Sequence, residues 1–161
     1  MKVAVAVEDS QYSQDVIHEL TKRRWPKDTD FKVLTVVEPL EHLIPTNTAG
    51  ADLCRATQAY RHHAAEKMCA EFRQQIIKGV ANSIVHFEVR EGHIKDEILK
   101  AAAAWGADKI ILGANTGLTT RAQSTGSTCR TVADHAHCGV EIIVPPSRRQ
   151  AKKEHSLMAL K

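Results

Sequence analysis

The residues best suited to chemistry lie between positions 113 and 128, in a stretch rich in glycine and hydroxyl side chains. Gly113, Gly117 and Gly126 occur in this stretch, and Ser127-Thr128 follow at the start of an expected helix. Glycine lets the backbone turn its N–H groups toward an anion, and the N-terminus of a helix adds partial positive charge. The stretch therefore predicts a phosphate-binding loop, although an ordinary connection between a strand and a helix has the same spacing.

A second candidate position follows the first apolar run of the chain. Val3–Val7 is rich in β-branched residues and predicts a buried strand, and Glu8 and Asp9 come directly after it. Ligands of open α/β sheets lie beyond the carboxyl ends of the strands, so Glu8 could bind a ribose hydroxyl. The two acidic residues could equally begin the next helix, and the sequence alone does not choose between these interpretations.

Patterns typical of catalysis and metal binding are missing from the sequence. It contains no G-x-S-x-G, no Gly-Lys-Ser/Thr of a Walker loop and no G-x-G-x-x-G. Asp134 and His135 are adjacent on an expected helix and cannot face each other, and His62-His63 do not have metal-ligand spacing. The cysteines form no C-x-x-C pair and are expected to be reduced thiols. We expect no catalytic residue, no metal ligand and no efficient enzyme.

Strands and helices alternate along the chain. The expected strands are Val3–Val7, Phe31–Val37, Ser83–Arg90, Lys109–Leu112 and Val140–Val144. The first expected helix begins at Ser10 or Ser13. The second follows the Glu38–Ala49 loop and ends near Gly79, and the last two cover His93–Trp105 and Thr128–Cys138. In Ser83–Arg90 the apolar side chains alternate with polar ones, which is typical of a half-exposed edge strand. The order predicts one α/β domain, a doubly wound, mostly parallel five-stranded sheet with helices on both faces.

Composition and charge exclude several classes of protein. The chain has 161 residues, of which 43% are hydrophobic and 25% charged, which is typical of a soluble globular domain. No apolar run is long enough to span a membrane, and the start of the chain is not a signal peptide, so we expect a cytoplasmic protein. The net charge of +3 is concentrated in residues 147–161, a tail with five basic residues and one acidic residue. Aromatic residues do not alternate with basic ones, so nucleic acid is not an expected partner.

The chain resembles the universal stress protein family along its first 146 residues. The resemblance rests on an ordered set of segments, Val5–Ser10, Val89–Gly92, Ala107–Gly113 and Gly126–Val144. It implies a domain over residues 1–146, followed by the basic tail over 147–161. It also implies the strand order 3-2-1-4-5, in which the strand that begins at Ser83 lies at one edge and the order reverses beside Glu8 and Gly113.

The resemblance further implies an adenine nucleotide, such as ATP, ADP or AMP, with or without magnesium. Many family members bind it through the pattern G-x2-G-x9-G-S/T, and the matching positions here lie in the stretch from Gly113 to Ser127. By this resemblance, the nucleotide site would consist of Ala6, Val7, Glu8, Val36, Gly113, Thr116, Gly117, Gly126, Ser127 and Thr128.

The sequence departs from the family pattern at several of these positions. Thr116 stands where the second glycine is expected, with Gly117 directly after it, and Glu8 stands where the family usually has aspartate. Asp9 replaces a usual glycine, and Cys129 replaces a usual serine or threonine. The sequence therefore supports two hypotheses: a nucleotide-binding stress protein with at most slow ATP hydrolysis, or a dimeric stress-signalling interaction module without nucleotide. In either case we expect a homodimer through Val140–Val144, an apolar edge strand. The alternative is that the chain's own tail, residues 147–161, covers this edge with its apolar side chains.

Overall fold

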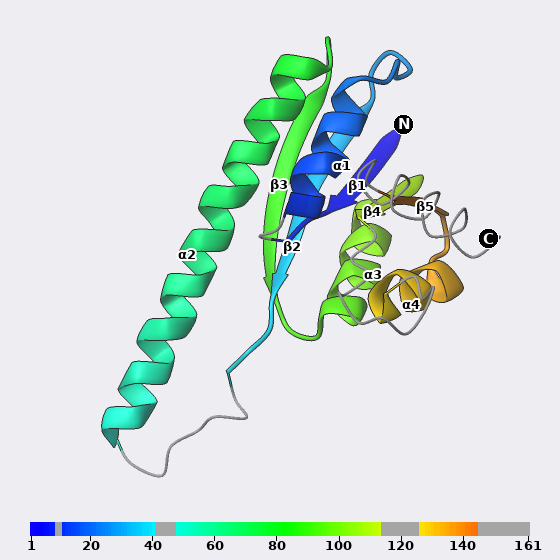
Figure 1. The fold of residues 1–161 in the computed structure, drawn as a ribbon. Helices are drawn as coiled ribbons and strands as arrows, with labels where there is room; N and C mark the ends of the chain where they lie inside the picture. The colour runs from blue at the N-terminus through cyan, green and yellow to red at the C-terminus, as the bar shows by residue number, and fades with distance from the viewer. Residues whose placement is uncertain (9–10, 41–47, 114–125, 145–161) are drawn as a thin grey trace, which may run out of the picture.

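The fold is an open parallel sheet with helices on both of its faces (Figure 1). The structure is a computed structural model that describes residues 1–8, 11–40, 48–113 and 126–144. Its elements, in chain order, are β1 (Lys2–Ala6), α1 (Gln11–Thr21), β2 (Asp30–Val37), α2 (Thr48–Gly79), β3 (Ile84–Glu91), α3 (Ile94–Trp105), β4 (Lys109–Gly113), α4 (Ser127–His135) and β5 (Gly139–Ile143). The sheet order is β3-β2-β1-β4-β5, and the predicted fold class and strand order are both confirmed.

Strands β1, β2, β4 and β5 contribute side chains to two separate cores, and β3 contributes to the first core only. On one face, Val3, Val5 and Ile111 pack with residues of α1 and α2. On the other face, Ala4 and Ile110 pack with residues of α3 and α4. Successive side chains of a strand point to opposite faces, so a strand covered on both sides must be apolar at nearly every position. This requirement explains the continuous apolar runs in β1 and β4.

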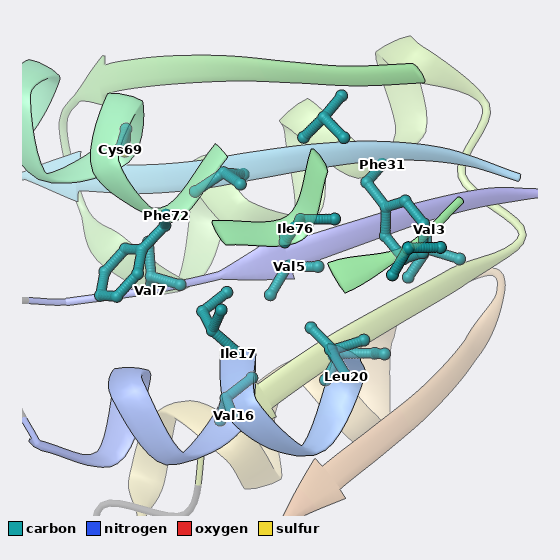
Figure 2. Close-up of a cluster of buried hydrophobic side chains, with 14 of the residues drawn as sticks. Val3, Val5, Val7, Val16, Ile17, Leu20, Phe31, Cys69, Phe72 and Ile76 are labelled. Atoms are coloured by element: carbon teal, nitrogen blue, oxygen red, sulfur yellow. The ribbon is translucent and has the colours of Figure 1, made fainter. Parts of the chain in front are cut away.

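The core between the sheet and the first two helices consists of buried apolar side chains. Figure 2 shows Val5 of β1 facing Ile17 of α1 and Ile76 of α2, all of which are almost fully buried. Cys69 of α2 lies in the same cluster, and its burial raises the pKa of the thiol to about 12. The thiol therefore stays protonated and acts as a small apolar group.

Several local expectations differ from the structure, and one or both ends of every strand are shifted by one residue. Helix α2 begins at Thr48, before the expected end of the loop at Ala49, and α4 ends at His135 because Ala136 adopts an extended conformation. In β3 the side chains of Val85 and Val89 join the first core, as expected, but Phe87 is 42% exposed. Strand β3 lies at an edge of the sheet, and its inward face is not fully covered at Phe87.

No described helix, including the 32-residue α2, is apolar enough over a long stretch to cross a membrane.

A chain of ion pairs joins β2, β3 and α3 on the face of the sheet that carries the second core. Glu88 of β3 accepts hydrogen bonds from Lys32 Nζ at 2.7 Å and from Arg90 Nε at 2.6 Å, and Arg90 also contacts Glu97 of α3 at 3.0 Å. Burial acts to raise the pKa of Glu88, but the hydrogen bonds from Lys32 and Arg90 outweigh it and hold the pKa below its usual value of 4.5. A carboxyl group whose pKa is lowered by folding stabilises the fold above its unfolded pKa, and this stability is lost as the pH falls through the folded pKa.

Replacing Glu88 by Gln should therefore destabilise the protein in a pH-dependent way. At about pH 7 we expect the free energy of unfolding to fall by about 1 kcal/mol, and near pH 3 the variant and the unmodified protein should differ much less. Urea denaturation at both pH values measures this difference. Glu38→Gln, at an exposed glutamate, is the matched control and should change neither value. An equal loss for Glu88→Gln at both pH values would show that packing, rather than charge, is responsible.

Candidate functional site

A cavity of about 240 Å³ lies at the carboxyl ends of β1, β2 and β4. Strand β1 pairs with β2 on one side and with β4 on the other, so the chain order of the strands reverses at β1. The crossover helices leave this position in opposite directions, which opens a crevice beyond the strand ends. The topology alone is therefore sufficient to create a binding site here.

One end of the cavity is apolar. Leu34 and Val36 contribute from β2, Ile94 and Ile98 from α3, and Leu112 from β4. Ile98 and Leu112 are buried, whereas Val36 and Ile94 are half-buried, so part of this wall is open to solvent. Such a surface accepts a flat apolar group, and the backbone edge of a strand can supply polar contacts to it.

The polar end of the cavity begins where the chain leaves β1. The N–H of Val7 donates to the carbonyl of Leu34 at 2.9 Å, and the hydroxyl of Thr35 donates to the carbonyl of Val7 at 2.7 Å. The N–H of Glu8 then donates to the hydroxyl of Ser13 in α1 at 2.8 Å. These bonds fix the backbone of Val7 and Glu8 against β2 and α1, and Glu8 itself is exposed.

The N-terminus of α4 forms the opposite wall of the polar end. Gly126 is the N-cap residue of this helix and, as a glycine, supplies no side-chain cap of its own, while Ser127, Thr128 and Cys129 follow along the cavity. The first N–H groups of a helix have no acceptor within the helix, so they are available to an anion. This wall can therefore bind a phosphate or a similar group.

Cys129 connects the start of α4 to the end of β4. Its thiol donates to the carbonyl of Gly113 at 3.4 Å. Burial, and then the negative charge of Glu8, raise the pKa of this thiol. The thiol is therefore neutral at physiological pH and adds no negative charge to the helix N-terminus.

Gly113 has a packing role in addition to its expected role beside an anion. A Cβ atom at this position would lie 3.1 Å from Cγ2 of Val16 and 3.6 Å from Cβ of Tyr12, both in α1. The absence of a side chain lets the first turns of α1 approach the end of β4. Because Tyr12 lines the cavity, this approach also helps to define its shape.

Those site residues predicted from the sequence that the structure describes all lie around the cavity. Ala6, Val7, Glu8, Val36, Gly113, Gly126, Ser127 and Thr128 all line the cavity. Thr116 and Gly117 lie outside the described residues, as does the tail over 147–161. The sequence reasoning did not assign Tyr12, Ser13, Leu34, Thr35, Ile94, Ile98 and Leu112 to the site. The sequence did indicate that Ile94 and Ile98 face inward from α3. An inward apolar stripe, however, predicts burial and does not predict a cavity.

The described residues contain no cluster of three or more His, Cys, Asp or Glu side chains that could hold a metal ion. Glu8 is the one charged side chain among the described residues that line the cavity. The site so described offers a helix N-terminus, hydroxyl groups and one carboxylate beside an apolar surface.

Several solved structures that are similar to this chain are described as universal stress proteins. UspA of Lactobacillus plantarum has a TM-score of 0.70 at 21% identity, covering 89% of this chain and 97% of that chain. An Arabidopsis thaliana family member with AMP bound has a TM-score of 0.62 at 14% identity, with coverages of 92% and 94%. A universal stress protein in complex with cAMP has a TM-score of 0.59 at 16% identity, with coverages of 90% and 97%. At these identities the likeness establishes the fold alone.

A search of curated protein sequences gave no significant match. The sequence model of the universal stress protein family, in contrast, matches residues 1–144, which extend from the first residue to the end of the last strand. The match spans the carboxyl ends of β1 and β4 and the start of α4, and it agrees with the resemblance seen in the sequence. The chain belongs to the universal stress protein family.

Proposed function

We propose that the chain binds an adenine nucleotide in the cavity between β1 and β4, as a sensor or regulator in a stress response. The observation that carries the proposal is that a single cavity has both an apolar wall and the N-terminus of α4. This cavity lies where the chain order of the strands reverses. A nucleotide has the same two-part character, with a flat base at one end and an anion at the other.

The base is expected to lie at the apolar end. Ile94 and Ile98 of α3 would cover one face of the ring, and the backbone at Val36 would meet its polar edge. The phosphate is expected to lie against the backbone of Gly126 and Ser127, where the dipole of α4 attracts negative charge. The cavity is continuous between these ends, so one small molecule can occupy both.

The ribose is expected to lie between the two ends, beside Glu8. A carboxylate accepts hydrogen bonds from the two ribose hydroxyls, and Glu8 lines the cavity with its backbone fixed by Ser13. This assignment gives a role to a carboxylate that would otherwise weaken the binding of an anion. It also favours a ribonucleotide over a deoxyribonucleotide.

Two of the similar structures support the ligand class, because one was solved with AMP bound and another in complex with cAMP. Magnesium prefers phosphate, water and one or two carboxylates as ligands, so the ion would accompany the phosphates rather than occupy a site made by the protein. The alternative remains an interaction module without nucleotide, and the following experiment decides between the two.

Replacing Gly126 by Val should weaken nucleotide binding. The new side chain would crowd the backbone that approaches the phosphate, and we expect affinity to fall about tenfold or more, which corresponds to about 1.4 kcal/mol. Titration calorimetry with AMP, ADP and ATP, with and without magnesium, measures this effect.

Ala133→Val, at an exposed position on α4 away from the cavity, is the matched control and should bind like the unmodified protein. If the unmodified protein gives no binding heat with any of the three nucleotides at millimolar concentration, the proposal fails. The interaction module then becomes the better description.

Replacing Glu8 by Ala should remove the preference for ribose. The unmodified protein is expected to bind AMP about tenfold more tightly than its 2′,3′-dideoxy analogue, because hydrogen bonds to a charged group contribute about 1.5–3 kcal/mol. In the variant the two ligands should bind with similar affinity. Glu38→Ala removes a carboxylate just beyond the end of β2, away from the cavity, and should keep the preference. An unchanged preference in Glu8→Ala would place the ribose elsewhere.

We also propose a homodimer formed by antiparallel pairing of β5 with β5 of a second copy. Within the described chain β5 pairs with β4 alone, so one edge of this strand is available. Val140 and Ile142 are half-buried, Val144 is 38% exposed, and Glu141 is held by Arg23 and Lys109. An apolar edge strand with its charge already paired is suited to pairing with its symmetry mate.

Light scattering should show a dimer at micromolar concentration, and Ile142→Pro should give a folded monomer, since proline disrupts strand pairing. Ile84→Pro, on the opposite edge strand of the sheet, is the matched control and should leave the dimer intact. Circular dichroism verifies that both variants fold. A monomeric unmodified protein would contradict the β5 dimer.

A further inference from the structure

The outward face of α2 carries exposed apolar side chains that neither the cavity nor the sheet uses. Leu53 and Tyr60 are 68% and 74% exposed, the highest values among the large hydrophobic residues of the described chain. They are seven residues apart, and exposed alanines lie between and beside them at helical spacing. This set, the α2 stripe, consists of Ala49, Leu53, Ala56, Tyr60 and Ala64.

The α2 stripe lies on the side of the helix opposite to the sheet. The buried residues of α2 are Cys69, Phe72 and Ile76, all in its C-terminal half. At about 100° per residue, Tyr60 lies roughly half a turn around the helix axis from Cys69. In Figure 1 the N-terminal half of α2 extends past the end of the sheet, so the stripe is on a projecting part of the molecule.

Two polar contacts hold the inner side of this projecting half. Gln58 Nε2 donates to a carboxylate oxygen of Glu91 at 2.7 Å, and Arg61 donates to the carbonyl of Glu38 at 2.8 Å. A helix owes most of its stability to the packing of an apolar face, and these contacts supply none. The stripe is the apolar face that this half of α2 still has available.

We propose that the α2 stripe pairs with the α2 stripe of a second copy of this chain, with the two helices antiparallel and Tyr60 at the two-fold axis. In this arrangement each Ala56 faces Ala64 of the second copy, and the small side chains permit a close approach of the helices. The two Tyr60 rings meet at the centre, where aromatic side chains can stack. The pairing uses neither β5 nor the nucleotide cavity.

The charges around the stripe select the antiparallel direction. Asp52, which also forms an exposed ion pair with Arg55 of its own helix, borders the stripe at its N-terminal end, and Lys67 and Glu71 continue the same face at its C-terminal end. Antiparallel pairing places Asp52 beside Lys67 of the second copy and Glu71 beside the N-terminus of its α2, and both contacts are favourable. Parallel pairing would instead place Lys67 against Lys67 and Glu71 against Glu71.

The interface is small, since each copy contributes two large apolar side chains. Stable interfaces usually bury about 1,200–2,000 Å² in total, so this pairing is expected to be weak by itself. A covalent trap is therefore the suitable measurement. A disulfide requires Cα atoms within about 7 Å of each other, which makes the trap specific for residues at the two-fold axis.

Tyr60→Cys should form an intermolecular disulfide rapidly under mild oxidation of the full chain. Ala49→Cys places an equally exposed thiol in the same stripe, but in the antiparallel pair its two copies lie about 33 Å apart along the helices. We expect Ala49→Cys to cross-link no faster than the unmodified protein, whose four native cysteines set the background. Non-reducing gel electrophoresis measures the rates, and circular dichroism verifies the fold.

A charge exchange tests the direction of the pair independently. In the Tyr60→Cys background, Lys67→Glu should slow cross-linking roughly two- to fivefold, as expected for the loss of an exposed ion pair, and adding Asp52→Lys should restore the rate. The proposal is overturned if Tyr60→Cys cross-links no faster than Ala49→Cys, or if the charge exchange has no effect. Faster cross-linking of Ala49→Cys would indicate a parallel pair and would also overturn it.

Discussion

The fold depends on the burial of β1 between two strands and two helical layers. Val3 and Val5 are fully buried on one face and Ala4 on the other, so the strand has no exposed side over most of its length. A strand in this position must pair on both edges, and β2 and β4 supply those edges in parallel. The pairing brings the carboxyl ends of three strands together, and the crossover helices must leave this place in opposite directions. The cavity is thus a consequence of how β1 is buried.

The contacts around the cavity serve stability and binding together. The hydroxyl groups of Thr35 and Ser13 are used to fix the backbone after β1, and Gly113 is needed for the approach of α1. The N-cap position of α4, in contrast, is Gly126, which supplies no side-chain cap of its own, although such a cap would stabilise a short nine-residue helix. A missing cap beside a cavity is costly unless another group satisfies the N–H donors. This cost is the physical reason to expect an anion at Gly126 and Ser127.

The sequence was informative where local chemistry decides the structure. The apolar runs of β1 and β4 predicted buried parallel strands, and Gly126-Ser127 predicted the start of a helix, whereas the anion site at this helix start stays a prediction. The strand order came from the family resemblance, because no local pattern states which strands pair. Ile94 and Ile98 were expected to face inward, but only the packing of α3 over the strand ends makes them cavity walls. Phe87 follows the alternation of β3 and is still exposed, since the position of α2 determines how much of that strand is covered.

The binding of a nucleotide at the start of α4 is the central claim, and amide NMR during titration with AMP tests it most directly. The largest shifts should occur at the amides of Ser127 and Thr128, with smaller ones at Glu8 and Val36 around the same cavity. The amides of the projecting half of α2, such as that of Tyr60, should not move, since they lie outside the cavity. Saturable shifts confined to α2, or no shifts at millimolar AMP, would contradict nucleotide binding at the β1–β4 reversal.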